Sequence, residues 1–203
     1  MGKYSDYNII PIGDHCAISL ILKELNLRKH SYPFDWVANI EQVYDSNIIY
    51  NIKIISDVKS SDNVYDIVKT YIGDAFYNDN KINSINNIWF PHDSGNINYN
   101  FEKYKIRFIR LKEDLNKKNM YILLTRHYYI EKSIFEKILQ QLLSYNSDSI
   151  ILFISGTNHI YFENSQYSNV IFKYIEYDIS QFYHFDYSNF RPNIKIFLSD
   201  LLL

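Results

Sequence analysis

The sequence predicts an α/β domain with a largely parallel sheet, and three observations support this. Continuous apolar runs at 120–125, 149–154 and 170–177 are typical of strands that are covered on both faces. An amphipathic pattern with helical spacing separates the first two runs, at 131–145. A further apolar run at 8–12 leads through a glycine turn into another helical pattern. Strands that alternate with helices favour a Rossmann-like, three-layer arrangement with helices on both faces of the sheet.

The N-terminal part of the chain predicts a strand–turn–helix unit. Residues 8–12 form the strand, Gly13-Asp14-His15 form the turn, and residues 16–27 form a helix whose apolar positions recur every three to four residues. Residues 31–36 are expected to be an extended loop, because Pro33 disfavours helical backbone at the residue before it.

The middle of the chain gives weaker patterns. Residues 39–50 are compatible with a helix. The segment 52–99 is polar and weakly periodic, so we expect it to be loop-rich, with one helix at 64–72. Clear helical spacing returns at 100–116, and residues 194–203 are expected to form a closing helix.

Composition narrows the classes of protein. With 203 residues, the chain fits a single domain spanning 1–203. The formal net charge of −2 provides no basic excess for a phosphate backbone, so no nucleic-acid partner is expected. A single cysteine excludes an internal disulfide and a cysteine-rich zinc site. No histidine and carboxylate spacing indicates a metal site, and no glycine-rich motif indicates a nucleotide, so we expect neither metal nor cofactor.

The sequence carries no signal for a membrane or for export. No apolar run approaches the roughly 20 residues of a transmembrane helix. The N-terminus lacks the apolar core of a signal peptide. We therefore expect a cytoplasmic protein. Tyr, Ile, Asn and Lys, which have A/T-rich codons, dominate the composition, and this indicates an A/T-rich genome. If that genome is viral, the compartment is the host cytoplasm.

The first candidate for chemistry is Cys16, at the expected start of a helix. Unpaired amides and a partial positive charge at a helix N-terminus stabilise a thiolate, and the same amides can stabilise an oxyanion. Gly13 and Asp14 shape the turn before it, and His15 would add cationic character. The alternative is a small core residue under a helix, because cysteine is commonly buried.

The second candidate is His92, in the segment Phe90-Pro91-His92-Asp93. A cysteine nucleophile needs a base within reach and a polar group that orients the base. Asp93 is one candidate for that orienting group, although neighbouring residues on a strand point to opposite faces. The alternative is an ordinary loop histidine.

Asp35 lies between two large aromatic residues, in Ser31-Tyr32-Pro33-Phe34-Asp35-Trp36. A buried carboxylate there needs hydrogen bonds, so Asp35 either organises the loop or belongs to the site, and the first reading is favoured. The other histidines are weaker candidates: His30, His127, His159 and His184.

Taken in order, several segments resemble a family of unknown function catalogued as papain-like cysteine peptidases, with members in bacteria and large DNA viruses. The segments that carry the resemblance are Ile12-Gly13-Asp14-His15-Cys16, Leu25-Asn26-Leu27-Arg28, Ser31 to Trp36, Phe90 to Asp93, and Lys103-Tyr104 with Arg107 and Arg110. The resemblance implies Cys16 as nucleophile, His92 as base and Asp93 or Asp35 as orienting acid. Gly13, Asp14, His15 and Trp36 would then line or support the site. It also implies an alternative fold, papain-like α+β, in which the cysteine helix packs on an antiparallel sheet.

The function we expect is therefore cysteine-dependent hydrolysis or acyl transfer on a peptide, amide or acyl substrate. Two other classes stay open. One is a Rossmann-like transferase or esterase with a site at the strand ends, and the other is a non-enzymatic protein that binds a host partner. Nothing in the sequence indicates an oligomeric state.

Overall fold

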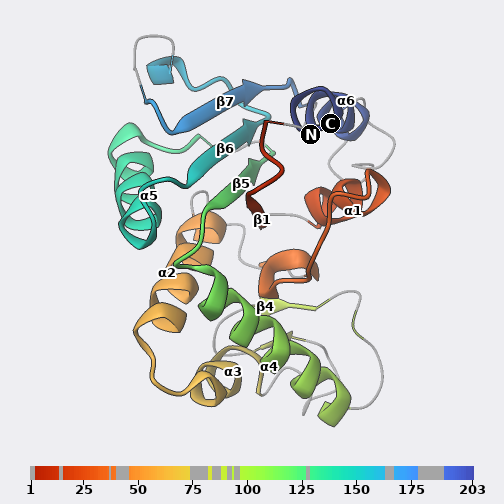
Figure 1. The fold of residues 1–203 in the computed structure, drawn as a ribbon, viewed down its shortest axis with the longest axis vertical. Helices are drawn as coiled ribbons and strands as arrows, with labels where there is room; N and C mark the ends of the chain where they lie inside the picture. The colour runs from red at the N-terminus through yellow and green to blue at the C-terminus, as the bar shows by residue number, and fades with distance from the viewer. Residues whose placement is uncertain are drawn as a thin grey trace.

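A computed structural model describes residues 3–13, 16–36, 38–39, 46–73, 82–83, 88–90, 93, 97–126, 129–162, 167–177 and 190–203. Its main sheet has four strands in the order β1 (Asn8–Gly13), β5 (Asn119–Thr125), β6 (Ile150–Ser155) and β7 (Val170–Tyr174), as Figure 1 shows. Each strand pairs parallel with the next. The carboxyl ends of all four strands therefore lie at one edge of the sheet.

The predicted α/β class with a largely parallel sheet is confirmed. The strand that precedes the cysteine helix, β1, pairs parallel with β5, which is the first of the two expected arrangements. Antiparallel pairing occurs instead in a small second sheet, in the order β2 (Ala38–Asn39), β4 (Ile88–Trp89) and β3 (Ile82–Asn83).

Helices cover both faces of the main sheet, which makes three layers (Figure 1). On one face, α1 (Ala17–Glu24) and α6 (Phe190–Leu202) pack against alternate strand residues: Met120, Ile122, Leu124, Leu152 and Ile154. On the other face, the intervening strand residues join a cluster with α2 (Ser46–Ser60), α3 (Val64–Ile72), α4 (Ile97–Asp114) and α5 (Lys132–Tyr145). Those strand residues are Ile10, Ile12, Tyr121, Leu123, Ile151 and Phe153.

Two parts of the middle segment differ from the sequence expectation. Asn39, the first residue of the helix expected at 39–50, lies in β2. The helix α2 occupies 46–60 and so extends into the segment 52–99 that was expected to be loop-rich. Its isoleucines are β-branched and favour strands, yet the buried residues recur with helical spacing: Ile48, Asn51, Ile52, Ile54, Ile55 and Val58. Packing against the sheet therefore outweighs local propensity here.

The loop at 31–36 is also more compact than expected, because Pro33–Trp36 form a 3₁₀ helix, η1. Pro33 suits its first position, where no amide donor is needed. Tyr32 N donates to Asp35 Oδ2 over 3.1 Å, and Asp35 N donates to Tyr32 O over 3.3 Å. This reciprocal pair closes the turn, and η1 then packs against β1, α1 and α4. A second 3₁₀ helix, η2, spans Ile160–Phe162.

The helices predicted at 64–72, 100–116, 131–145 and 194–203 are confirmed as α3, α4, α5 and α6, with small shifts at their ends. None of the helices within the described ranges is long and apolar enough to cross a membrane.

Candidate functional site

Cys16 lies where the sequence predicts, at the junction between β1 and α1. It is the N-cap of α1, its side chain is buried with 8% exposed, and Cys16 O accepts the first helical hydrogen bond from Leu20 N over 3.2 Å. The backbone amides at the N-terminus of a helix carry a partial positive charge. They are therefore placed to stabilise negative charge next to the thiol.

The end of β1 is held tightly behind Cys16. Asn51 of α2 donates from Nδ2 to Gly13 O over 3.2 Å. A Cβ at Gly13 would lie 3.0 Å from Leu124 Cβ, closer than side chains normally approach, so a glycine suits this contact between β1 and β5. Asp14 and His15, the other residues of the predicted turn, lie outside the described residues.

His92 and Pro91 also lie outside the described residues, whereas Phe90 and Asp93, on either side of them, are described. Phe90 and Asp93 are buried, and Asp93 N donates to Phe90 O over 3.3 Å. The Tyr104 ring packs edge-on against Phe90 with centroids 5.1 Å apart, and its hydroxyl donates to Asp93 Oδ2 over 2.5 Å. Lys103 forms an ion pair with Asp93 Oδ1. The Lys103-Tyr104 pair on α4 therefore anchors both ends of the segment that contains His92.

The contacts of Asp93 bear on its proposed role. Both of its carboxylate oxygens are engaged by side chains of α4. Burial raises the pKa of Tyr104 well above its ordinary value, and the neighbouring Asp93 charge acts in the same direction. The phenol therefore stays protonated and keeps donating to the carboxylate.

Asp35 is fully buried and forms an ion pair with Arg28, seven residues earlier in the chain. Burial raises the pKa of Asp35 above its ordinary value, while the charge of Arg28 and the hydrogen bond from Tyr32 N oppose that shift. These partners lie within residues 28–35, and they fit the favoured reading that Asp35 organises the loop. Trp36 belongs to the same 3₁₀ helix, and its side chain is outside the described part of the structure.

Arg107 lies close to Tyr104, the partner of Asp93, and acts on Asp35. Its guanidinium lies over the Tyr104 ring, with Cζ 4.7 Å from the centroid, and its charge also acts to lower the pKa of Asp35. Arg107 is itself buried. Residues 31–36 and the pair Phe90 and Asp93, which are far apart in sequence and belong to segments of the family resemblance, thus both contact α4. The roles of Arg28, Lys103, Tyr104 and Arg107 were not deduced from the sequence, although each residue belongs to a segment that carries the resemblance.

The carboxyl edge of the sheet also holds two buried hydroxyls, at the ends of β5 and β6. Thr125 Oγ1 and Ser155 Oγ are 2.9 Å apart, and Ser155 Oγ accepts from Thr157 N over 3.1 Å. Gly156 N donates to Thr125 O over 2.8 Å. These contacts connect the carboxyl ends of β5 and β6 to each other.

Of the remaining histidines, the structure describes His159 and His30. His159 is buried; its Nε2 accepts from Ile130 N over 2.9 Å, and its Nδ1 lies 2.8 Å from Thr157 O. Its ring stacks on Tyr129 with centroids 4.8 Å apart. These contacts make it a structural residue. His30 lines a surface cavity, whereas His127 and His184 fall outside the described residues. Over the described part of the chain, no group of three or more His, Cys, Asp or Glu side chains could hold a metal ion.

Comparison with known families identifies the family of the chain. Residues 7–154 match a family model described as "Putative papain-like cysteine peptidase (DUF1796)". The matched region begins just before β1 and includes Cys16, the Asp35 loop, the His92 segment and α4. No curated protein and no solved structure matches the chain.

Proposed function

The chain belongs to this family of papain-like cysteine peptidases, and from that premise we propose that it hydrolyses a peptide, another amide or an acyl ester, with Cys16 as nucleophile and His92 as base. The observation that carries the proposal is the position of Cys16 at the N-terminus of α1, shortly after β1, the outer strand of the four-stranded parallel sheet. It is also the one cysteine of the chain.

The proposed reaction has two stages. His92 takes the thiol proton as Cys16 Sγ attacks the substrate carbonyl carbon, and the carbonyl oxygen becomes an oxyanion held by amides at the start of α1. The bond to the leaving group then breaks, and His92 protonates that group. A thioester remains on Cys16. Water, deprotonated by His92, attacks the thioester, and the thiolate leaves and is reprotonated.

The buried carboxylates support this chemistry indirectly. Because both oxygens of Asp93 are engaged by Lys103 and Tyr104, Asp93 acts as a positioning residue that fixes the backbone beside His92. Asp35 has a comparable role in η1, which packs against β1 and α1, the two elements that flank Cys16. Neither carboxylate needs to contact the imidazole for these roles.

The test is the rate at which iodoacetamide alkylates Cys16 as a function of pH. All labelling reports on one site, because the chain has one cysteine, and Cys16→Ser provides the blank. We expect a thiolate that titrates well below about 8.5, the value for an unperturbed thiol. His92→Ala should raise that midpoint, and His30→Ala, at a distant surface site, should leave it unchanged. A profile that is identical in wild type and His92→Ala, or an inert Cys16, would overturn the proposal.

A further inference from the structure

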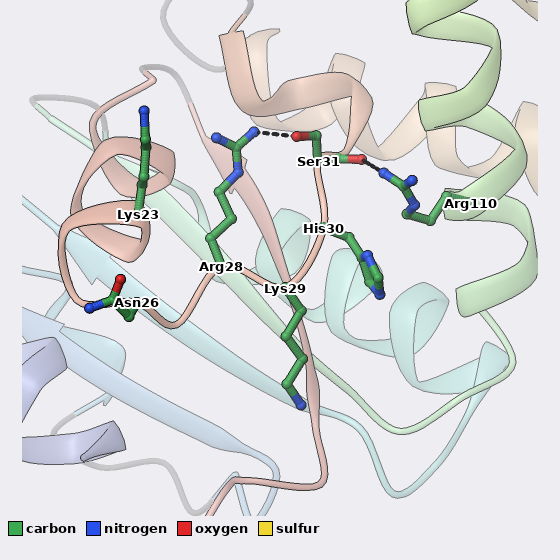
Figure 2. A pocket seen from close by; sticks show the side chains of 7 residues that line it. All are labelled: Lys23, Asn26, Arg28, Lys29, His30, Ser31 and Arg110. Carbon is green, nitrogen blue, oxygen red and sulfur yellow. Dashed lines mark hydrogen bonds between the residues drawn. The ribbon is translucent and has the colours of Figure 1, made fainter.

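An open cavity lies at the C-terminal end of α1, at the opposite end of that helix from Cys16. Its volume is about 460 Å³, within the range of small-molecule sites. We call it the basic cavity; its lining residues are Lys23, Asn26, Arg28, Lys29, His30, Ser31 and Arg110 (Figure 2). Four of these carry a permanent positive charge and none is a carboxylate, although the whole chain has a net charge of −2. The positive charge is therefore concentrated locally.

The backbone of the cavity is fixed by the way α1 ends. Asn26 has the left-handed φ of 57°, which asparagine tolerates better than most residues. Leu27 N donates to Leu22 O over 2.9 Å, and Asn26 N donates to Lys23 O over 3.1 Å. This pair of bonds is a Schellman motif, and it turns the chain directly into the segment 28–31. The floor of the cavity is therefore formed before any ligand arrives, which lowers the entropic cost of binding.

Ser31 holds two arginines from different parts of the chain. Arg28 Nη2 donates to Ser31 Oγ over 2.7 Å, and Arg110 Nη1 of α4 donates to Ser31 O over 3.0 Å. Figure 2 shows the two guanidinium groups on either side of Ser31, with Lys23 extending in the same direction as Arg28. Lys29 extends the other way and donates to Ser5 O over 3.1 Å. The two guanidinium groups are therefore oriented by contacts within the protein.

Most of the positive charge of the cavity has no compensating carboxylate. Among ion pairs between described residues, Arg28–Asp35 is the one that involves a lining residue. Lys23 and Arg110 thus keep their charge towards a ligand, whereas Lys29 is directed towards Ser5. The C-terminus of α1 contributes a partial negative charge of about one half, which the two cations outweigh.

We propose that the basic cavity binds the phosphate group of a small phosphorylated ligand. Guanidinium groups match the tetrahedral oxygens of phosphate with paired N–H donors, and a lysine adds a point charge. A phosphate dianion or diphosphate neutralises more of this charge than a single carboxylate does. With 8 residues, α1 separates the cavity from Cys16 by about 12 Å of helix rise, so this site is distinct from the thiol and does not depend on the function proposed above.

Isothermal titration calorimetry with inorganic phosphate, pyrophosphate and acetate tests the proposal, with ionic strength held constant by sodium chloride. We expect saturable binding at one site, tightest for pyrophosphate and weakest for acetate. Lys23→Glu and Arg110→Gln should each weaken pyrophosphate binding at least tenfold. The matched control is Lys137→Glu, which makes the same charge change on an exposed position of α5 and should leave binding unchanged.

The variants are chosen to remain folded. Lys23 is exposed, and glutamine at position 110 keeps an amide donor for Ser31 O. Thermal unfolding without ligand checks this point. Three results would overturn the proposal: no saturable binding at millimolar pyrophosphate, equal weakening by Lys137→Glu, or acetate binding as tight as pyrophosphate.

Discussion

The two faces of the main sheet bury different kinds of side chain. Under α1 and α6 the buried cluster is aliphatic and aromatic, and nearby charges lie at the surface, as in the ion pairs of Glu24 with Arg191 and Lys195. On the other face, in and around α4, charged side chains are buried as well: Asp35, Asp93, Arg107 and Asp114. Both clusters pack against the same sheet. Among the described residues, charged side chains are buried only on the side of α4.

This difference indicates that the α1–α6 face mainly stabilises the fold, whereas the α4 face also shapes the candidate site. Removing an ion from water costs several kcal/mol, and replacing a buried ion pair by apolar residues is often neutral or stabilising. The α1–α6 face shows that this chain can build an apolar layer. Asp35, Asp93 and Arg107 lie in the segments that carry the family resemblance, which fits the proposal that the charges around α4 help to position Cys16 and His92.

The largest effect that tests this comparison is expected for Asp35→Leu. The substitution leaves Arg28 largely buried without its carboxylate, so the free energy of unfolding should fall by about 3–5 kcal/mol. Urea denaturation measures it. The matched control is Lys195→Met, which breaks an exposed ion pair on the other face and should cost no more than about 1 kcal/mol.

The double variant Arg28→Met/Asp35→Leu sharpens the same test. If the loss arises from an uncompensated charge, the second substitution should recover part of the stability. If Asp35→Leu costs no more than Lys195→Met, the two faces do not differ energetically, and the comparison fails.

A smaller effect is expected for Tyr104→Phe, which removes the hydroxyl that donates to Asp93. Because a hydrogen bond to a charged group is lost, the free energy of unfolding should fall by about 1.5–3 kcal/mol. The control is Tyr99→Phe on the same helix, where the side chain is 69% exposed and the cost should stay within about 0.5 kcal/mol. Tyr104→Phe should also alter the pH profile of Cys16 alkylation, whereas a change in stability alone would mean that Tyr104 does not position His92.

The elements that could be predicted from the sequence are those whose signals are local. A continuous apolar run predicts a buried parallel strand, and a glycine turn between a strand and a helical pattern predicts the βα unit that presents Cys16. The helix α2 could not be recognised so easily, because its isoleucines favour strands and Asn51 interrupts its buried face. Only the structure shows that Asn51 bonds the end of β1.

The buried charges could not be predicted for a different reason. The partners of Asp93 lie on α4, and the pair between Arg28 and Asp35 forms because the chain turns at Asn26 and again in η1. A sequence shows that these polar residues are present, but their burial depends on where the loops fold back. The roles of Cys16, His92 and the two carboxylates stay predictions that the experiments above address.

The smallest expected effect concerns how the free energy of unfolding depends on pH through His159. This residue contacts Ile130 and Phe153, which belong to the same buried cluster as α4. Burial lowers the pKa of His159 below its ordinary value of 6.5, so the folded state favours the neutral ring. The stability this provides is present above about pH 6.5 and is lost as the pH falls through the lowered pKa, with a slope of at most about 1.4 kcal/mol per pH unit.

His159→Phe should lose stability at neutral pH, because Ile130 N–H loses its acceptor, but its stability should depend less on pH between about 7 and 5. Urea denaturation across that range measures both effects, and His30→Phe, at an exposed histidine, should keep the wild-type slope. If His159→Phe keeps the wild-type slope as well, His159 does not contribute to the dependence of stability on pH.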